Sequence, residues 1–196
     1  MSKSLKGTKT ANNLLTAFAG ESQATMRYTY YAKTAKKEGY NQISAIFEET
    51  ARNEKEHAKR FMKFLAEDLQ GEALRVDWDF PVALADTPAN LLAAAEGEHE
   101  EFVEMYPGFA DVAEEEGFMK VAVAFREIAK VEDRHERRYR KLLQNIKDNT
   151  VFRKEDENTL WKCDNCGYIY EGAEAPQICP ACLHKQEYFE VFCENY

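Results

Sequence analysis

Glutamate and histidine residues interrupt the apolar faces of four helical segments, and this feature constrains the fold more than any other. Each segment places apolar residues at alternating steps of four and three, the pattern of a helix that buries one face. A glutamate is almost never fully buried unless it is paired or bound to a metal. Two segments supply one glutamate each, and two supply a Glu-x-x-His motif, whose residues share a helix face. The interrupting residues are Glu21, Glu54, His57, Glu98, Glu132 and His135.

Proline and glycine mark where these helices begin and end. The first 80 residues contain no proline, which favours two long helices before an extended crossover at residues 74–81, where apolar and polar side chains alternate. Thr87 followed by Pro88 is typical of a helix start, with Thr87 as the N-cap. Four helices with one long crossover predict a mainly α chain built on a four-helix bundle. The predicted helices cover residues 10–38, 41–69, 87–116, with an interruption near Pro107 and Gly108, and 118–146.

An internal repeat links the two halves of the predicted bundle and supports this choice of residues. The change of offset within the repeat places one extra residue between Glu98 and Tyr106. We therefore predict a one-residue bulge in the third helix, of the kind often found at functional sites. The matched segments are Gly20-Glu21 with Gly97-Glu98 at an offset of 77, and, at an offset of 78, Tyr28 with Tyr106, Glu38-Gly39-Tyr40 with Glu116-Gly117-Phe118, and Glu54-x-x-His57 with Glu132-x-x-His135.

The repeat is asymmetric at one position. Glu101 lies three residues after Glu98 and shares its helix face, whereas the equivalent residue of the first helix is Ala24. One half of the site thus has a spare carboxylate, which could bind a metal in one oxidation state and release it in another. Six ligand-type residues in phase with four apolar stripes are what a carboxylate-bridged di-metal site needs. Oxygen and nitrogen ligands suit iron or manganese, with zinc also compatible, and iron is the redox-capable choice.

All five cysteines lie in the last 34 residues, which excludes an evenly spread disulfide framework. Two Cys-x-x-Cys pairs, separated by twelve residues, can place four thiolates tetrahedrally around zinc or a single iron. The spacing alone does not distinguish a redox-active iron site from a structural zinc ribbon. The predicted ligands are Cys163, Cys166, Cys179 and Cys182, while Cys193 is expected to be a free thiol packed near the C-terminus.

Composition limits the partners and the compartment. A net charge of −9 argues against nucleic acid or an anionic membrane surface as the main partner. No apolar run approaches the roughly 20 residues needed to span a bilayer. No signal peptide is recognisable, so the cytoplasm is the expected compartment. The expected domains are a helical metal-binding bundle over residues 1–147, a linker over 148–159 and a four-cysteine domain over 160–196.

These motifs together resemble the rubrerythrin family over nearly the whole chain. The resemblance implies a ferritin-like bundle followed by a small rubredoxin-like metal-knuckle β domain. Leu183 stands where rubredoxins carry glycine after the last cysteine, so it must adopt a turn conformation unusual for a branched residue. The similar segments are Ala19-Gly20-Glu21-Ser22, Glu54-Lys55-Glu56-His57, Gly97-Glu98-His99-Glu100-Glu101, Met105-Tyr106-Pro107, Glu132-Asp133-Arg134-His135, residues 161–172 and Cys179-Pro180-Ala181-Cys182.

The resemblance also implies a role for each candidate residue. Tyr28 and Tyr106 would form hydrogen bonds with the metal-binding carboxylates. The four cysteines would hold one redox-active iron, with zinc as a substitute, and pass electrons to two non-haem irons in the bundle. The implied ligands of that di-iron site are the bridging Glu54 and Glu132, the terminal Glu21 and Glu98, His135 on one iron, and His57 or Glu101 on the other, exchanging with redox state.

The activity implied by the resemblance is reduction of hydrogen peroxide to water in oxidative-stress defence. Electrons would come from NAD(P)H through separate redox proteins, such as a rubredoxin or a reductase. Family members are usually homodimers or larger, with the tail of one chain near the di-iron site of another. Two alternatives stand beside this one: a ferroxidase or iron-handling protein, and a metal-stabilised binding module with structural zinc and no turnover.

Overall fold

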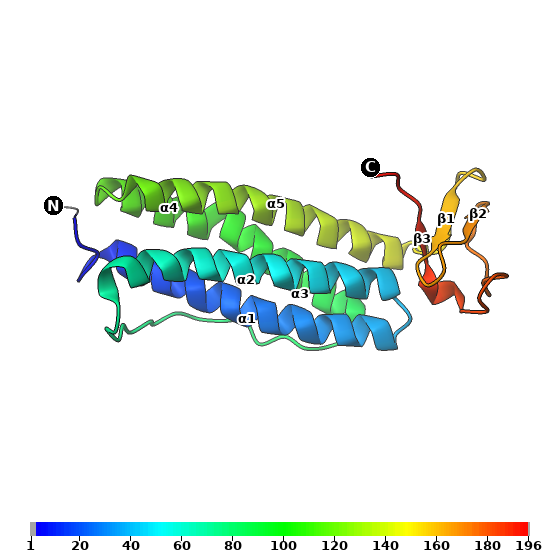
Figure 1. Cartoon of the computed structure of the whole chain (residues 1–196), viewed down its shortest axis with the longest axis horizontal. Helices are drawn as coiled ribbons and strands as arrows, with labels where there is room; N and C mark the ends of the chain where they lie inside the picture. The colour runs from blue at the N-terminus through cyan, green and yellow to red at the C-terminus, as the bar shows by residue number, and fades with distance from the viewer. Residues whose placement is uncertain (1–2, 196) are drawn as a thin grey trace.

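The helical part of the chain forms two antiparallel units that lie side by side in a long bundle (Figure 1). The computed structural model describes residues 3–195. None of the helices in this described part is both long enough and apolar enough to cross a bilayer. The helices are α1 (Lys9–Lys37), α2 (Asn41–Leu69), α3 (Thr87–Glu100), the π-helix η1 (Glu101–Met105), α4 (Tyr106–Glu115) and α5 (Met119–Lys147).

Each unit turns at a glycine with a left-handed backbone. Gly39, with φ of 81°, follows α1, and Gly117, with φ of 80°, follows α4. In both turns the residue after the glycine donates its N–H to a carbonyl five residues earlier, at 2.9 Å and 2.7 Å. These bonds satisfy carbonyls that would otherwise be free at a helix end. The two turns are equivalent in the sequence repeat, so the repeat is also one of structure.

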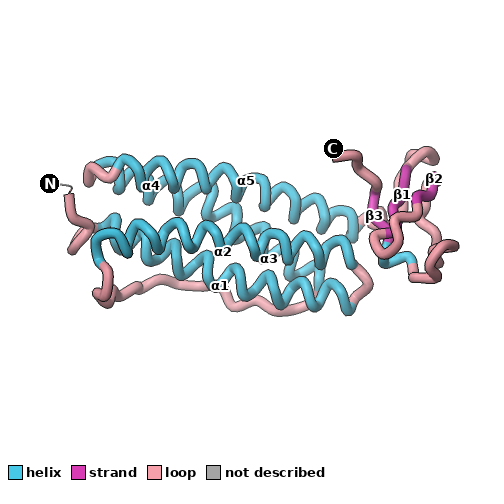
Figure 2. The backbone as a smooth tube through the Cα atoms, viewed as in Figure 1, coloured by secondary structure: helices cyan, strands magenta, loops and turns pink. Residues whose placement is uncertain are grey.

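An extended crossover joins the two units. Residues 72–85 contain neither helix nor strand and run along α1 (Figures 1 and 2), as predicted for residues 74–81. The Tyr31 hydroxyl anchors the crossover by donating to the Ala83 carbonyl at 2.8 Å. The N-cap of α3 is Asp86 rather than the predicted Thr87, because the backbone is extended at Asp86 and its carboxylate accepts a hydrogen bond from the Ala89 N–H at 3.0 Å.

The third helical segment widens into η1 between Glu98 and Tyr106, which confirms the predicted one-residue bulge. The predicted interruption near Pro107 and Gly108 was wrong in position. Pro107 lies in the first turn of α4, where a missing N–H is tolerated, and the helix continues through it. The wide turn takes up the extra residue, so the equivalent tyrosines of the two units both face the bundle interior.

Buried apolar side chains form two clusters along the bundle. One includes Phe61 and Phe125, whose ring centroids are 4.9 Å apart, and the other includes Phe47 and Tyr139, at 5.1 Å. Such aromatic contacts add to the stabilisation gained from buried area. The predicted ligands on α2 and α5 lie between these aromatic residues in sequence, so they occupy the middle of the bundle, with an apolar cluster on either side.

The tail is a small antiparallel sheet with the strand order β2-β1-β3. Trp161 fills its core, fully buried, and donates its Nε1–H to the Gly172 carbonyl at 2.8 Å. Phe152 belongs to the predicted linker but packs against this core. The backbone of Arg153 forms an isolated antiparallel β-bridge with that of Glu174. Part of the predicted linker is therefore bound to the tail. The elements are β1 (Leu160–Cys163), β2 (Ile169–Glu171), the 3-10 helix η2 (Gln186–Tyr188) and β3 (Phe189–Val191).

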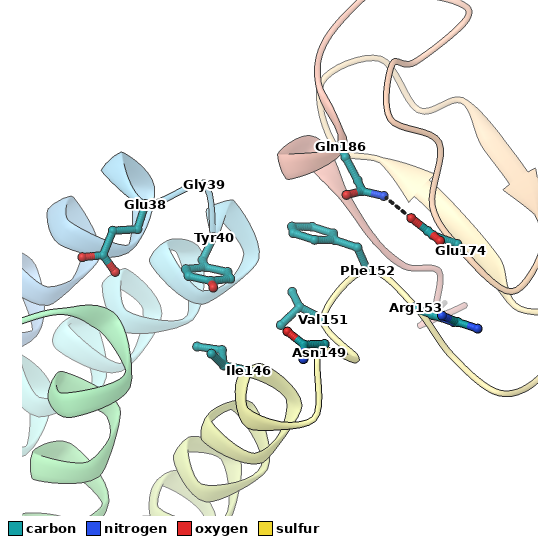
Figure 3. Close-up of a pocket in the computed structure, with 10 residues that line it drawn as sticks. All are labelled: Glu38, Gly39, Tyr40, Ile146, Asn149, Val151, Phe152, Arg153, Glu174 and Gln186. Carbon is teal, nitrogen blue, oxygen red and sulfur yellow. Dashed lines mark hydrogen bonds between the residues drawn. The ribbon is translucent and has the colours of Figure 1, made fainter.

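A cleft of about 390 Å³ lies between the end of the bundle and the tail (Figure 3). The α1–α2 turn, the end of α5 and the tail form its walls, and Gln186 donates to Glu174 at 3.4 Å on the tail side. None of the residues predicted to bind metal lines this cleft. The candidate chemistry therefore lies inside the bundle and inside the tail.

Candidate metal centres

Four helices bring six of the predicted ligands to one buried place in the bundle. The three-residue spacing of each Glu-x-x-His pair puts both side chains on the inner face of one helix. The four glutamates and His135 are at most 4% exposed, and the His57 side chain is 14% exposed. These six predicted ligands are Glu21 from α1, Glu54 and His57 from α2, Glu98 from α3, and Glu132 and His135 from α5.

The ligand atoms form two groups that share two carboxylates. Within each group, one ligand atom from every residue lies within 4.8 Å of the others. Glu54 and Glu132 belong to both groups, which is the position of carboxylates that bridge two metal ions. Their partners differ, because Glu21 and His57 complete one group while Glu98 and His135 complete the other.

Both histidines contact the shared carboxylates. His57 Nδ1 lies 2.9 Å from Glu54 Oε2 and 3.0 Å from Glu132 Oε1, and His135 Nδ1 lies 2.8 Å from Glu132 Oε2. Burial favours neutral imidazoles, but Glu132 and Glu54 outweigh it and raise the pKa of His57 to about 10 and that of His135 to about 12. Burial also opposes ionisation of Glu54, yet the two histidines lower its pKa to about 2.

The other two carboxylates, Glu21 and Glu98, have too little positive charge near them to offset their burial. Burial and then repulsion from Glu54 raise the pKa of Glu98 to about 8, and the same causes raise the pKa of Glu21 well above its usual range. Each of the four glutamates has at least one buried oxygen without a hydrogen bond to the described residues, and the close contacts of His135 Nδ1 lack hydrogen-bond geometry. Such orphaned atoms are rare in folded proteins. A convergent set of oxygen and nitrogen donors fits a pair of iron or manganese ions.

Two tyrosines orient the carboxylates that the groups do not share. Tyr28 donates to Glu98 Oε1 at 2.6 Å, and Tyr106 donates to Glu21 Oε1 at 2.5 Å. Both tyrosines are buried, and each leaves the second carboxylate oxygen free. Hydrogen bonds of this kind fix the direction in which a ligand faces its metal.

Glu101 lies beside the site but belongs to neither group. Burial, followed by repulsion from Glu98, raises the pKa of Glu101 well above its usual range. His57 belongs to one of the two groups and Glu101 to neither, so the structure presents the arrangement in which the histidine, not Glu101, faces a metal position. Sequence analysis missed Arg27, whose positive charge acts on Glu101. No periodicity or repeat points to this arginine.

The four predicted cysteines of the tail form the second centre. The Sγ atoms of Cys163 and Cys182 are 3.7 Å apart, as are those of Cys166 and Cys179, and all four lie within 4.8 Å of one another. Metal–sulfur bonds of about 2.3 Å in a tetrahedron place the sulfurs roughly 3.8 Å apart. The sulfur positions therefore fit one tetrahedral ion. Cys193 is exposed rather than packed as predicted, because it lies on the extended C-terminal segment.

Each Cys-x-x-Cys loop closes through a residue in the left-handed conformation. Gly167 has φ of 78° and Leu183 has φ of 61°, as expected for its place after the last cysteine. The two N–H groups donate to cysteine carbonyls at 2.8 Å and 2.9 Å. A hydrogen bond from the His184 backbone N–H is the main reason that the pKa of Cys182 falls to about 6, which favours the thiolate that binds metal.

These two centres define the class of protein: a helical bundle with a carboxylate di-metal site, joined to a four-cysteine metal domain. Residues 12–143 match the Rubrerythrin family, and residues 161–190 match the rubredoxin-like domain of rubrerythrin. A rubrerythrin of Clostridium perfringens is 65% identical over 99% of this chain and 100% of its own length. The chain belongs to the rubrerythrin family, as its motifs predicted.

Solved structures agree with the predicted fold. Nigerythrin in its fully reduced, all-ferrous state is 32% identical, with a TM-score of 0.64 over 97% of this chain and 92% of its own. A bacterioferritin from Desulfovibrio desulfuricans is 25% identical, with a TM-score of 0.65 over 72% of this chain and 82% of its own. The bundle is ferritin-like, and the chain carries a di-iron carboxylate site together with a four-cysteine, rubredoxin-like metal site.

We predict that the metal-free protein loses stability as pH rises from about 5 to about 8. The pKa of Glu98 is about 8 in the folded chain against 4.5 for an ordinary glutamate, so the folded state binds more protons than the unfolded state in this window. The free energy of unfolding must then fall with rising pH, and His135 acts in the same direction from pH 6.5 upward. Glu54 titrates below this window. Urea denaturation at several pH values measures the slope.

Two comparisons isolate the cause of this slope. A Glu98→Gln variant should flatten it, whereas Glu100→Gln, at an exposed neighbouring position, should leave it unchanged. Iron loading should also flatten it, because metal ions replace the protons among the carboxylates. A metal-free protein that gains stability over the same window would contradict this description of the site.

Proposed function

We propose that the protein reduces hydrogen peroxide to water as a defence against oxidative stress. One observation carries the proposal: a buried carboxylate di-iron site and a four-cysteine site occur in the same chain. The second site is suited to one-electron transfer when it holds iron, because thiolate ligands favour redox-active iron. A chain that only stored or sensed metal would have no need of it.

The reduction of hydrogen peroxide determines the roles that the residues of the bundle would have. Conversion of one hydrogen peroxide into two waters consumes two electrons and two protons. A bound di-iron pair supplies both electrons at the O–O bond. We assign Glu54 and Glu132 as the bridging ligands because they belong to both groups of ligand atoms. Glu21 and Glu98 would be terminal ligands, His135 would bind one iron, and Tyr28 and Tyr106 would hold the terminal carboxylates in place.

Glu101 and His57 would alternate on the other iron. His57 lies within one group of ligand atoms, while Glu101 is in neither group and is repelled by Glu98, Glu132 and Glu54. More positive charge on the metal pair favours an additional carboxylate, and less charge favours a neutral imidazole. The exchange would therefore match the charge of the ligand set to the redox state. The π-helix that begins at Glu101 supplies the local adjustment such a movement needs.

The alternative function is ferroxidase activity, with which the bundle would be compatible if it lacked the tail. A ferroxidase takes its electrons from substrate iron, so a four-cysteine electron-transfer site would have no part in its reaction. The tail therefore favours peroxide reduction. A separate rubredoxin or an NAD(P)H-dependent reductase would supply the electrons, and the unpaired cysteines suit a reducing compartment such as the cytoplasm.

Electrons would pass between two copies of the chain. Glu54 lies thirteen residues from the tail-side end of α2, about 20 Å along the helix, and the tail lies beyond that end (Figure 1). This separation favours delivery from the tail of a second copy, hence a homodimer or a larger homo-oligomer.

A groove on the bundle surface suits such a tail. Its lining includes the apolar Phe18 and Met62, and three lysines outnumber one glutamate there: Lys55, Lys59 and Lys63 against Glu56. Residues 160–196 carry six acidic side chains against two lysines. The opposite charges favour docking of the tail of one copy in the groove of another.

A Glu101→Ala variant should fold and bind iron but react with peroxide about 10- to 100-fold more slowly, the usual cost of disturbing the surroundings of a metal. It should fold because the substitution removes one of several mutually repelling buried carboxylates. Glu100→Ala, at the exposed neighbouring position, serves as the control and should react at the parental rate. Stopped-flow oxidation of the reduced protein measures both. Parental reactivity of Glu101→Ala would rule out the ligand exchange.

Mixing two inactive variants tests transfer between copies. Glu54→Ala disables the di-iron site and Cys166→Ser disables the tail site, so each variant alone should be inactive. After subunit exchange, dimers that contain one of each should combine an intact bundle with an intact tail and restore about a quarter of the parental peroxidase activity. The exposed Cys193→Ser variant should be active by itself. A mixture that stays inactive, although mixed dimers form, would mean that electrons pass within one chain.

A further inference from the structure

We propose that a small cavity beneath the crossover is the site where hydrogen peroxide waits beside the metal pair, held by Arg27 and kept open by Gly20 and Gly97. This inference rests on the proposed peroxide reduction and adds to it the residues that admit and select the substrate. It assigns a function to the crossover, to an arginine and to two glycines that the metal site itself leaves unexplained.

The cavity has a volume of about 40 Å³ and lies between α1, the crossover and the start of η1. Trp78 and Phe80 of the crossover form its outer wall, and Glu101 forms part of its inner wall. A cavity needs about 10 to 15 Å³ to hold one water molecule, so this one has room for a molecule of one or two oxygen atoms. Hydrogen peroxide fits this space, whereas an organic hydroperoxide with a branched alkyl group does not.

Arg27 presents unused hydrogen-bond donors at this cavity. Its Nε and Nη1 atoms are buried and have no hydrogen-bond partner among residues 3–195. The guanidinium group has five N–H donors and no acceptor. Buried donors in folded proteins are nearly always satisfied. A ligand with lone-pair oxygens is therefore the partner that this side chain lacks.

Gly20 and Gly97 are equivalent in the sequence repeat, and each precedes a terminal carboxylate of the site. Both lie inside helices, where glycine is less favourable than alanine, and neither has a positive φ. A Cβ at residue 20 would lie 3.8 Å from Glu101 Oε1 and 3.9 Å from Phe80, and one at residue 97 would lie 3.9 Å from Arg27 Nη2. These are ordinary contact distances, so alanine would fit. Neither backbone conformation nor steric contact requires glycine here, and what the glycines preserve is the open space.

The polar groups of the cavity match the chemistry of hydrogen peroxide. Each peroxide oxygen can accept a hydrogen bond, and each carries one O–H that can donate. Arg27 supplies donors, and a carboxylate oxygen of Glu101 supplies an acceptor. Glu101 lines the cavity and is close enough to Glu98 and Glu132 to be repelled by them, so it connects the cavity with the predicted metal site. Movement of Glu101 would then give the waiting peroxide access to the metal position.

Glycine-to-alanine variants test the space directly. Gly20→Ala and Gly97→Ala should lower kcat/KM for hydrogen peroxide about tenfold, the cost of losing roughly one hydrogen bond to the substrate, with the loss in KM rather than kcat. Gly108→Ala is the control, since a Cβ at this helical glycine would meet nothing within 4 Å and the residue lies outside the cavity. It should keep the parental kcat/KM. Equal iron content and equal visible spectra would exclude damage to the metal sites.

A binding measurement that needs no turnover completes the test. In the zinc-loaded protein, which cannot reduce peroxide, the NMR signal of Arg27 Nε–H should shift saturably on titration with hydrogen peroxide. It should not shift with tert-butyl hydroperoxide. The signal is assigned by its loss in Arg27→Lys.

The outcomes separate this inference from the proposed function. A saturable Arg27 shift in a protein that fails to turn over peroxide would uphold the binding site and overturn the proposed activity. A protein that reduces peroxide, but whose Arg27 signal does not move and whose Gly20→Ala and Gly97→Ala variants match Gly108→Ala, would overturn the cavity and leave the proposed activity intact.

Discussion

The stability of the fold depends on how the mutual repulsion of the carboxylates in the middle of the helical bundle is offset. Glu54 and Glu132 lie within 4.8 Å of Glu21 in one group and of Glu98 in the other, and each group contains only one imidazole. Protons or metal ions must supply the missing positive charge, because water cannot reach these groups. The apolar clusters on either side provide the stabilisation that makes such a centre tolerable. Metal binding and folding stability are consequently linked.

Much of this architecture could be predicted from the sequence because its signals are periodic. Apolar stripes located the helices, and charged residues in phase with those stripes located side chains that the structure brings together. The repeat offset located the widened turn before Tyr106, since a single inserted residue has only a few ways to be accommodated inside a helix. The sulfur ligands followed from their spacing alone, because two Cys-x-x-Cys pairs leave few other arrangements.

The features that sequence analysis misplaced depend on local geometry or tertiary contacts. Pro107 reads as a helix breaker, yet in the first turn of α4 it interrupts nothing. Asp86 and Thr87 are both good caps, and only the backbone decides between them. Phe152 reads as part of a linker until the tail provides the core on which it packs. Arg27 carries no sequence signal, because its significance comes from the crossover that covers it.

We propose that the tail iron and the di-iron site form one electron path that ends on peroxide. The most direct test is to reduce the iron-loaded protein without oxygen and to mix it with stoichiometric hydrogen peroxide or, separately, with dioxygen. The colour of the iron–thiolate site reports oxidation of the tail. Fast return of this colour with peroxide and slow return with dioxygen is the result we predict. A faster return with dioxygen, or a tail iron that stays reduced while peroxide is consumed, would contradict the account.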